Sequence, residues 1–267
     1  MESIKISLRI ILNSQHNVIY LTPSLMNALG CSTGRLTISF GNKKLFVQVK
    51  KRNDSSNTLF MSRQVANSLA IPFSGSLSAY FKDNEIHIGA VIGILTTNYS
   101  GNLNFPFGRR SETQAHYLES GHNEPVCFFT FTPELINWSD QTVEGIFRRW
   151  SPKTQRFFWI KRRCALPQAI YDRIPAPRAE QAESIINTKM RLKSILSTKW
   201  FNQGYFNKWS LHQRLMEKGR INDFIPETSS SPTTGQVELM LKRHKMVYLK
   251  PARGSLGIGI IKITSIP

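Results

Sequence analysis

Cysteine is scarce in this chain. Only three cysteines occur among 267 residues, Cys31, Cys127 and Cys164, and they are far apart in the sequence without any C-x-x-C pair. This odd, scattered set excludes the disulfide framework of a small secreted domain and offers no zinc-binding spacing. The sequence therefore predicts a protein that folds by burying an apolar core in a reducing compartment such as the cytoplasm.

Long hydrophobic runs are lacking as well. The longest apolar stretch lies near residues 86–95, well short of the roughly 20 residues that cross a bilayer as a helix. The first residues, MESIKISLRIIL, contain charges and lack the cleavage region of a signal peptide. We expect no membrane span.

Acidic residues are outnumbered two to one. The chain has 35 Lys and Arg against 17 Asp and Glu, which gives a formal net charge of +18. The basic clusters at 148–150, 161–163 and 242–244 are short and dispersed. A solvated basic surface is the simplest interpretation, and general affinity for polyanions such as nucleic acid is the alternative.

Several familiar catalytic motifs are absent. The sequence contains no P-loop, no G-x-G-x-x-G fingerprint, no H-E-x-x-H and no G-x-S-x-G elbow. Its six histidines show no metal-ligand spacing. We therefore predict no metal site, and the candidate chemistry has to come from other patterns.

A weak internal repeat occupies the first 88 residues. The segment that begins at Ile19 aligns with the one that begins at Leu59, and Thr22 then coincides with Ser62. Each copy predicts a strand, a short helix capped by that hydroxyl, and two strands joined by a polar turn. Two such units predict a small β-barrel with pseudo-twofold symmetry over residues 1–88. An ordinary β-rich domain with a chance repeat is the alternative.

Residues 89–180 predict a small α/β domain. GAVIGILTTN at 89–98 is continuously apolar, as is typical of a parallel strand covered on both faces. A helix over 111–122 and strands over 125–131 and 155–163 follow. Residues 143–150 are interpreted as a short helix or the lead into a turn.

The last part of the chain, residues 181–267, alternates helices with loops and ends in a hairpin. Apolar residues at helical spacing follow Glu180, a loop and helix cover 201–219, and a Pro/Ser/Thr-rich loop covers 222–235. A short helix then leads into VYLKPARGSLGIGIIKI. This ending predicts two strands around a glycine-bearing loop, with a plain glycine-turn hairpin as the simplest interpretation.

The hairpin loop carries groups suited to phosphate. Glycines at 254, 257 and 259 let the backbone approach a ligand closely, and backbone N–H groups of such turns bind phosphate oxygens. Lys250 precedes the loop and provides a mobile positive charge, while Arg253 and Ser255 add donors.

Three ordered segments carry a family resemblance: AIYDRIPAPRAE at 169–180, WFNQGYFNKWSLHQRL at 200–215 and the terminal KPARGSLGIGI. The hairpin resembles the phosphate-covering hairpin of ATP-grasp enzymes, which are carboxylate–amine ligases. The three segments together resemble the YheC/YheD family of spore-coat-associated ATP-grasp proteins. The resemblance implies an α+β and α/β multidomain chain: the barrel-like domain at 1–88, an α/β pre-ATP-grasp domain at 89–180, and an incomplete N-terminal ATP-grasp subdomain at 181–267.

The resemblance also implies a nucleotide site for ATP. Lys208, in FNKW, matches the first lysine that meets the phosphates, and Lys250 matches the lysine placed against the α-phosphate and adenine. The flexible phosphate loop corresponds to Gly254, Ser255, Gly257 and Gly259. Arg173, in YDRIP, is assigned either to substrate or to a structural ion pair with its neighbour Asp172.

The family pattern places Mg²⁺ binding in a second subdomain, and no Asp, Glu or Asn follows Glu238 here. We therefore expect a C-terminally truncated ATP-grasp protein that lacks ligase activity alone and binds ATP weakly or not at all, with Mg²⁺ needed only in a full-length protein. The resemblance suggests a cytoplasmic or spore-coat setting, with spore-coat proteins as partners. The alternative is a non-enzymatic spore-coat or polyanion-binding protein.

Overall fold

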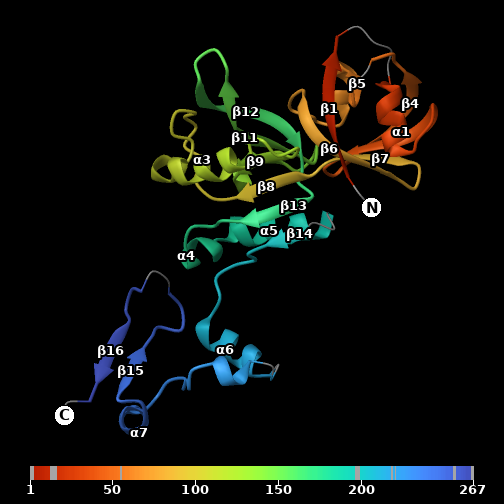
Figure 1. Cartoon of the computed structure of the whole chain (residues 1–267). Helices are drawn as coiled ribbons and strands as arrows, with labels where there is room; N and C mark the ends of the chain where they lie inside the picture. The colour runs from red at the N-terminus through yellow and green to blue at the C-terminus, as the bar shows by residue number, and fades with distance from the viewer. Residues whose placement is uncertain are drawn as a thin grey trace. The chain divides into compact units, whose positions relative to one another are not determined.

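The structure is a computed structural model that describes residues 3–12, 17–54, 56–195, 199–217, 219, 221–254 and 257–265. The chain divides into two compact units, Met1–Gln203 and Gly204–Pro267. Figure 1 shows the first unit in red to green-blue and the second in blue. The two units are described separately.

The first unit begins with a closed seven-stranded barrel (Figure 1). The strands follow one another around it in the order β1-β5-β2-β4-β3-β7-β6. Their bounds are β1 Ile4–Ile11, β2 Val18–Leu21, β3 Gly34–Phe40, β4 Lys43–Lys51, β5 Thr58–Ser62, β6 Gly75–Lys82 and β7 Glu85–Gly89. Because β1 pairs with β6, the sheet closes and these seven strands leave no open edge.

The predicted repeat is present in the barrel as a repeated order of elements. Helix α1 (Pro23–Leu29) follows β2, and helix α2 (Arg63–Ser68) follows β5. The Thr22 hydroxyl accepts a bond from the Leu25 amide at 3.3 Å, and the Ser62 hydroxyl accepts one from the Val65 amide at 3.1 Å. Both caps are those that the sequence predicts. Strand β1 lies outside the repeat and closes the barrel between β5 and β6.

The barrel interior is filled by apolar side chains from alternate positions of the strands. Fully buried members include Ile19, Leu21, Ile38, Phe40, Leu59 and Met61. This alternation places one set of side chains inside and leaves polar residues on the outer surface. The burial explains how the short strands of the barrel hold together without disulfides, since all three cysteines are free thiols.

The rest of the first unit is a seven-stranded sheet in the order β10-β11-β9-β8-β13-β14, with β12 added beside β11. The strands are β8 Val91–Leu95, β9 Cys127–Phe131, β10 Ile136–Asn137, β11 Thr142–Ser151, β12 Arg156–Ala165, β13 Ala169–Asp172 and β14 Lys199–Phe201. The central strands β9, β8, β13 and β14 run parallel. The parallel strand predicted in residues 89–98 is therefore confirmed as β8.

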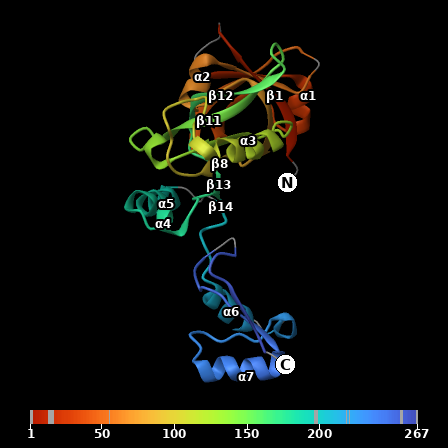
Figure 2. The same cartoon turned by 90° about the vertical axis from the view of Figure 1, so that its left-hand side faces the viewer.

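Helices accompany this sheet. Helix α3 (Ser111–Ser120), preceded by the 3-10 turn η1 (Gly108–Arg110), lies against β9 and β11 (Figures 1 and 2). Helices α4 (Pro177–Glu180) and α5 (Glu183–Ile195) follow β13, and the 3-10 turn η2 (Pro133–Leu135) follows β9. The interpretation of residues 143–150 as a short helix is wrong, because they belong to β11, which pairs with both β9 and β12 and leads into the turn at residues 152–155.

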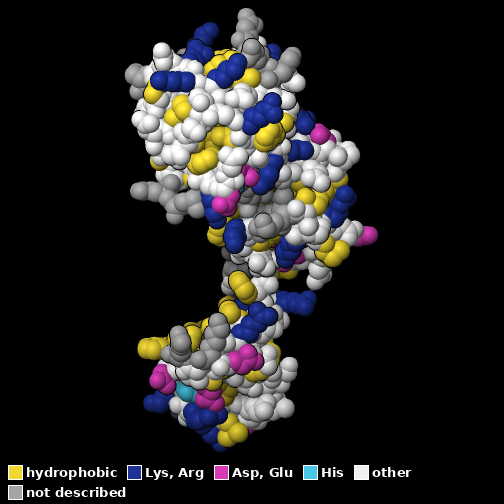
Figure 3. Space-filling view, turned by 90° about the vertical axis from the view of Figure 1, so that its right-hand side faces the viewer, with side chains coloured by type: hydrophobic (Ala, Val, Ile, Leu, Met, Phe, Trp, Pro, Cys, Tyr) yellow, Lys and Arg dark blue, Asp and Glu magenta, His cyan; other side chains and the backbone are white. Residues whose placement is uncertain are grey.

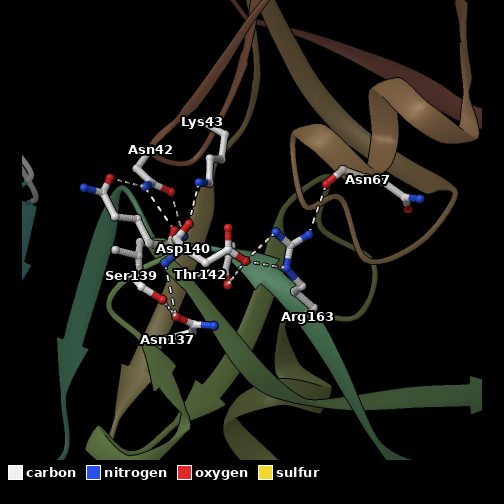
Figure 4. A network of polar contacts seen from close by, with 10 residues as sticks. Asn42, Lys43, Asn67, Asn137, Ser139, Asp140, Thr142 and Arg163 are labelled. Atoms are coloured by element: carbon white, nitrogen blue, oxygen red, sulfur yellow. Dashed lines mark hydrogen bonds and ion pairs between the residues drawn. The ribbon is translucent and has the colours of Figure 1, made fainter. Parts of the chain in front are cut away.

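A polar network joins the barrel to the sheet (Figure 4). Asn42, in the turn after β3, exchanges bonds with the backbone of Leu166 at 3.2 and 2.8 Å. Lys43 Nζ donates to the Asp140 carbonyl at 2.6 Å, and Arg163 donates to Asp140 Oδ2 at 2.7 Å. Arg163 also reaches back to the Asn67 carbonyl of the barrel at 3.1 Å. These contacts fix the barrel and the sheet as parts of one compact unit.

The second unit is small and open to solvent. It contains α6 (Lys208–Glu217), the 3-10 turn η3 (Asn222–Phe224), α7 (Thr234–His244) and a hairpin of β15 (Met246–Leu249) and β16 (Ile261–Thr264). None of its described residues is buried, in contrast to the barrel and the sheet. The finer domain boundaries at residues 88 and 180 stay a prediction.

Positive charge is spread over the surface of the first unit. On the face drawn in Figure 3, Lys and Arg side chains are scattered between apolar and uncharged ones and do not form one continuous patch. No helix in the described part of the chain has the length and apolar character that a bilayer crossing requires.

Candidate functional site

The candidate site lies in the second unit, around the loop between β15 and β16. Gly257 and Gly259 both have φ of 75°, in the left-handed region that L side chains rarely adopt. A Cβ atom at Gly259 would lie 3.0 Å from Pro251 Cγ, so the loop also folds tightly there. The glycines are therefore required by the shape of the loop as well as by any ligand that lies against it.

Lys208 is brought to this loop from a distant part of the sequence. Asn207 begins α6 by accepting a bond from the Ser210 amide at 3.1 Å, which places Lys208 at the first helical position. The Lys208 amide donates to the Ala252 carbonyl at 2.9 Å, and its ammonium donates to the carbonyls of Pro251 and Gly254 at 3.1 and 2.8 Å. Lys208 thus holds the start of the loop between β15 and β16 in place.

Lys250 lies directly after β15, at the entrance to the same loop. Its side chain is exposed, and its ammonium lies 5.6 Å from the centre of the Tyr248 ring. A cavity of about 880 Å³ is lined by Lys208, Lys250 and Gly259 together with residues of α7 and of the loop before it. Two lysines and the glycine loop therefore border one cavity within the second unit.

Part of the lining of this cavity comes from the Pro/Ser/Thr-rich loop, residues 226–232. Glu227 anchors that loop to α7 by contacts with Arg243 at 2.8 Å and with His244 at 2.6 Å. The hydrogen bond from His244 lowers the pKa of the Glu227 carboxyl below its usual value, and the charge of Arg243 adds to this effect. Thr233 and Gln236 form a reciprocal capping box that starts α7.

The structure brings together most of the residues that the sequence assigns to the nucleotide. Lys208, Lys250 and Gly259 line the cavity, and the Gly254 carbonyl accepts a hydrogen bond from the Lys208 ammonium. Arg253 and Gly257 lie exposed in the same loop. Ser255 is outside the described residues. Sequence reasoning missed Glu227, because no local motif marks it and its partners are about 17 residues further along the chain.

Arg173, the tentative substrate residue, belongs to the first unit. The proposed ion pair with Asp172 is wrong: the Asp172 carboxylate contacts Lys189 at 2.5 Å and accepts a bond from Trp200 Nε1 at 3.2 Å. The Arg173 guanidinium instead lies over the rings of Tyr117 and Tyr171, 5.2 and 5.5 Å from their centres. Side chains of Asp172 and Arg173 point to opposite faces of the sheet because they are neighbours on an extended chain.

The donors of the second unit fit the phosphates of a nucleotide. Two ammonium groups and a loop with left-handed glycines are the chemistry that binds phosphoryl oxygens. For a metal ion the fit is different: within the described ranges, no group of three or more His, Cys, Asp or Glu side chains is placed to hold one. No metal role is therefore assigned to these residues.

Comparison with known proteins agrees with the motifs. Residues 197–266 match the sequence model of the YheC/D-like ATP-grasp family. The endospore coat-associated protein YheD of Bacillus subtilis (strain 168) is 30% identical over 251 residues, which cover 94% of this chain and 53% of that protein. The endospore coat-associated protein YheC of the same organism is 31% identical over 139 residues, which cover 51% of this chain and 36% of that protein.

Two solved structures show weaker likeness. The ATP-grasp ligase PsnB, solved with a phosphomimetic variant of its minimal precursor, Mg and ADP, matches with a TM-score of 0.34 and 14% identity, over 65% of this chain and 57% of PsnB. The computationally designed protein msDPBB_sym2 matches with a TM-score of 0.24 and 17% identity, over 29% of this chain and 95% of that protein.

The chain spans about half the length of YheD, since the aligned residues cover 53% of that protein. They cover 36% of YheC. The match to the ATP-grasp family lies over α6, α7 and the hairpin, where Lys208 and Lys250 border the cavity. The resemblance predicted from the three sequence segments is confirmed: residues 197–266 carry ATP-grasp sequence of the YheC/D type, and the chain is similar to YheD over 94% of its own length.

Proposed function

We propose that the second unit binds the phosphates of ATP and belongs to an ATP-dependent ligase of the carboxylate–amine type. The observation that carries this proposal is the convergence of Lys208 and Lys250 on one glycine loop and one cavity. These residues are 42 positions apart, and the family match covers both of them. Two ammonium groups that border one cavity with left-handed glycines suit a polyphosphate better than a neutral ligand.

The two lysines have different tasks in this proposal. Lys208 bonds to two backbone carbonyls and so fixes the loop, and it is also near enough to the cavity to meet a phosphate oxygen. Lys250 has its ammonium exposed and supplies the mobile charge. Loss of Lys250 should therefore weaken binding with little effect on the loop, whereas loss of Lys208 should also loosen the loop.

Direct titration tests the proposal. Binding of ATP, ADP, AMP and adenosine to the whole chain is measured by calorimetry, with Lys208→Ala, Lys250→Ala and the exposed control Lys242→Ala on α7. We expect affinity to fall from ATP to adenosine, and each site lysine to account for about tenfold in affinity, as one charge-assisted bond does. Equal affinity for ATP and adenosine, or equal loss in Lys242→Ala, would contradict the assignment.

We further propose that this chain does not complete a ligation by itself. The resemblance places metal binding in a second subdomain, and within the described residues no group of three or more His, Cys, Asp or Glu side chains is placed to hold a metal ion. Phosphoryl-transfer chemistry depends on metal ions that neutralise the charge developing on the phosphoryl group. A single ADP-forming turnover by the purified chain with Mg-ATP would refute this part of the proposal.

A second candidate function is polyanion binding by the first unit, within a spore-coat or cytoplasmic setting. The β11–β12 hairpin supports it, since residues 142–165 hold seven Lys and Arg against one acidic residue, Glu144. Arg156 and Arg162 are exposed there, next to Phe158, whose side chain is also exposed. Binding of this kind should weaken steeply with salt and should not change in Lys250→Ala.

A further inference from the structure

The carboxyl edge of the parallel sheet in the first unit holds an arrangement that the proposed function does not use. The last aligned residues of three neighbouring strands are Phe131 of β9, Leu95 of β8 and Asp172 of β13. The chain runs from β8 to β9 on one side and later adds β13 on the other side of β8. Open α/β sheets bind ligands beyond the carboxyl ends of their strands, at such a change of direction.

The residues directly after these three strands form a row. They are Thr132, Thr96 and Arg173, and because side chains alternate along strands, all three face the same side of the sheet. That side is the one covered by α3, because Thr130, two residues before Thr132 and therefore on the same side, bonds to Gln114 of α3 at 3.1 Å. The row therefore lies at the sheet edge next to the start of α3.

Arg110, directly before α3, reaches into this row. Its guanidinium donates to the Thr97 carbonyl at 2.8 Å, to the Thr97 hydroxyl at 3.2 Å and to the Thr96 hydroxyl at 3.4 Å. The Thr96 hydroxyl in turn donates to the Arg173 carbonyl at 3.3 Å. All acceptors of the Arg110 guanidinium are neutral. They position its side chain, but they do not neutralise its positive charge.

Both arginines lack an acidic partner among the described residues, where the ion pairs of the first unit all involve other side chains. Arg148 and Arg163 of the same sheet, in contrast, pair with Glu119 and Asp140 at 2.7 Å. Burial lowers the pKa of Arg110, because its charged form is partly removed from water. Two partly buried guanidinium groups at one sheet edge are an arrangement that an anion would stabilise.

A buried hydroxyl at the same edge adds to this picture. Thr132 is fully buried, and within the described part of the chain its Oγ1 has no hydrogen-bond partner. Buried hydroxyl groups are nearly always hydrogen-bonded, so an unpaired one in the same row as Thr96 and Arg173 marks a place where a further polar group is expected. The hydroxyls of Thr96 and Thr97 are also able to donate there once they are reoriented.

We propose that Arg110 and Arg173, with the hydroxyls of Thr96 and Thr132, bind the oxyanion group, carboxylate or phosphate, of a small-molecule substrate at this sheet edge. As the substrate site of a ligase, the assignment rests on the function proposed above. The oxyanion site itself does not, since it is built only from the first unit and needs no nucleotide.

Arginine-specific labelling with phenylglyoxal tests the site on the whole wild-type chain without nucleotide. The labelling rate of each arginine is followed by peptide mass spectrometry in sodium succinate, in sodium phosphate and in sodium chloride of equal ionic strength. At ten times its dissociation constant, a bound oxyanion should slow labelling of Arg110 and Arg173 about tenfold. Protection by succinate alone identifies a carboxylate site and protection by phosphate alone a phosphate site. Unchanged rates at both residues overturn the proposal.

Variants separate this site from the nucleotide site. In thermal-shift titrations with the protecting anion, Arg110→Gln and Arg173→Gln should each weaken the apparent affinity about tenfold. The exposed control Arg156→Gln and the second-unit variant Lys250→Ala should not. Loss of the shift in Lys250→Ala alone overturns the sheet-edge site and supports phosphate binding by the second unit. Equal loss in Arg156→Gln shows unspecific anion binding and overturns the proposal as well.

Discussion

The buried ion pair between Lys189 and Asp172 allows a quantitative prediction. Lys189, on α5, contacts the Asp172 carboxylate of β13 at 2.5 Å and the Glu180 carboxylate at 2.9 Å. Only 2% of the Asp172 side chain and 15% of the Lys189 side chain are exposed. Substitution of Lys189 by Met keeps the aliphatic length and removes the charge, so Asp172 stays buried without its cation.

Removal of one partner from a buried pair costs about 3–5 kcal/mol. The lower end applies here, because Asp172 still accepts bonds from Trp200 Nε1 and from the Ile174 amide, both at 3.2 Å. We therefore expect Lys189→Met to lower the free energy of unfolding of the first unit by about 3 kcal/mol. For a domain of 150–250 residues this corresponds to a fall in Tm of roughly 6–12 °C.

The pH dependence has a defined sign. Burial alone favours the neutral amine, but the hydrogen bonds and charges of Asp172 and Glu180 outweigh it and raise the pKa of Lys189. A raised folded-state pKa gives stability that is complete below the unfolded value of about 10.4 and is lost as the pH rises through the folded value. The difference between wild type and Lys189→Met should thus shrink in alkaline solution.

Urea unfolding followed by far-UV circular dichroism measures the effect, with Lys193→Met as control. Lys193 lies on the same helix but is exposed, and its ammonium is 5.4 Å from the Trp200 ring centre. This control should lose no more than about 1 kcal/mol. Equal midpoints for the two variants would refute the reasoning that Asp172 depends on Lys189.

Three further predictions follow from the fold. Gly30→Ala should lower the stability of the barrel by about 1 kcal/mol, because Gly30 has φ of 68° and open space around it, so only backbone strain changes; an unchanged urea midpoint would contradict this. Amide hydrogens of the described residues 204–254 should exchange faster than those of the barrel strands, since none of the former residues is buried; equal protection by mass spectrometry would refute it. As the pH falls below about 4.3, exchange in the loop around Glu227 should rise, because the lowered pKa of Glu227 gives stability that is lost on protonation; a pH-independent loop would count against its anchoring role.

The barrel could be predicted largely because its signals are local. The hydroxyls of Thr22 and Ser62 mark helix starts, and each accepts a hydrogen bond from an amide only three residues later. The polar turn after Phe40 separates two strands within one short segment. The place of β1 in the closed barrel could not be predicted, since it depends on pairing with β6 more than 60 residues away. Strand β11 was missed for the same reason: its charged residues obscure the alternation, and its conformation comes from β9 and β12 on either side.

The candidate nucleotide site came from sequence only through the family resemblance. Lys208 and the glycine loop have no shared local pattern, and their contact depends on how the chain brings the start of α6 to the loop after β15. Arg110 gave no signal at all in the sequence. It becomes notable only in the folded chain, where the end of β8 supplies three neutral acceptors and no acid. The sequence suggested Arg173 as the ion-pair partner of Asp172. The observed partner is Lys189, because α5 brings this residue next to β13.

The most direct test of the central claim, that the second unit binds nucleotide phosphates, is a thermal shift of the chain with Mg-ATP, compared with Lys250→Ala. Ligand at 100 times its dissociation constant adds about 2.7 kcal/mol of stability to the unit that binds it. For a unit as small as residues 204–267, we expect a rise of roughly 11–22 °C in its melting temperature in the wild type, which is lost or strongly reduced in Lys250→Ala. An equal rise in both proteins, or no rise in either, would contradict the assignment of this loop to ATP.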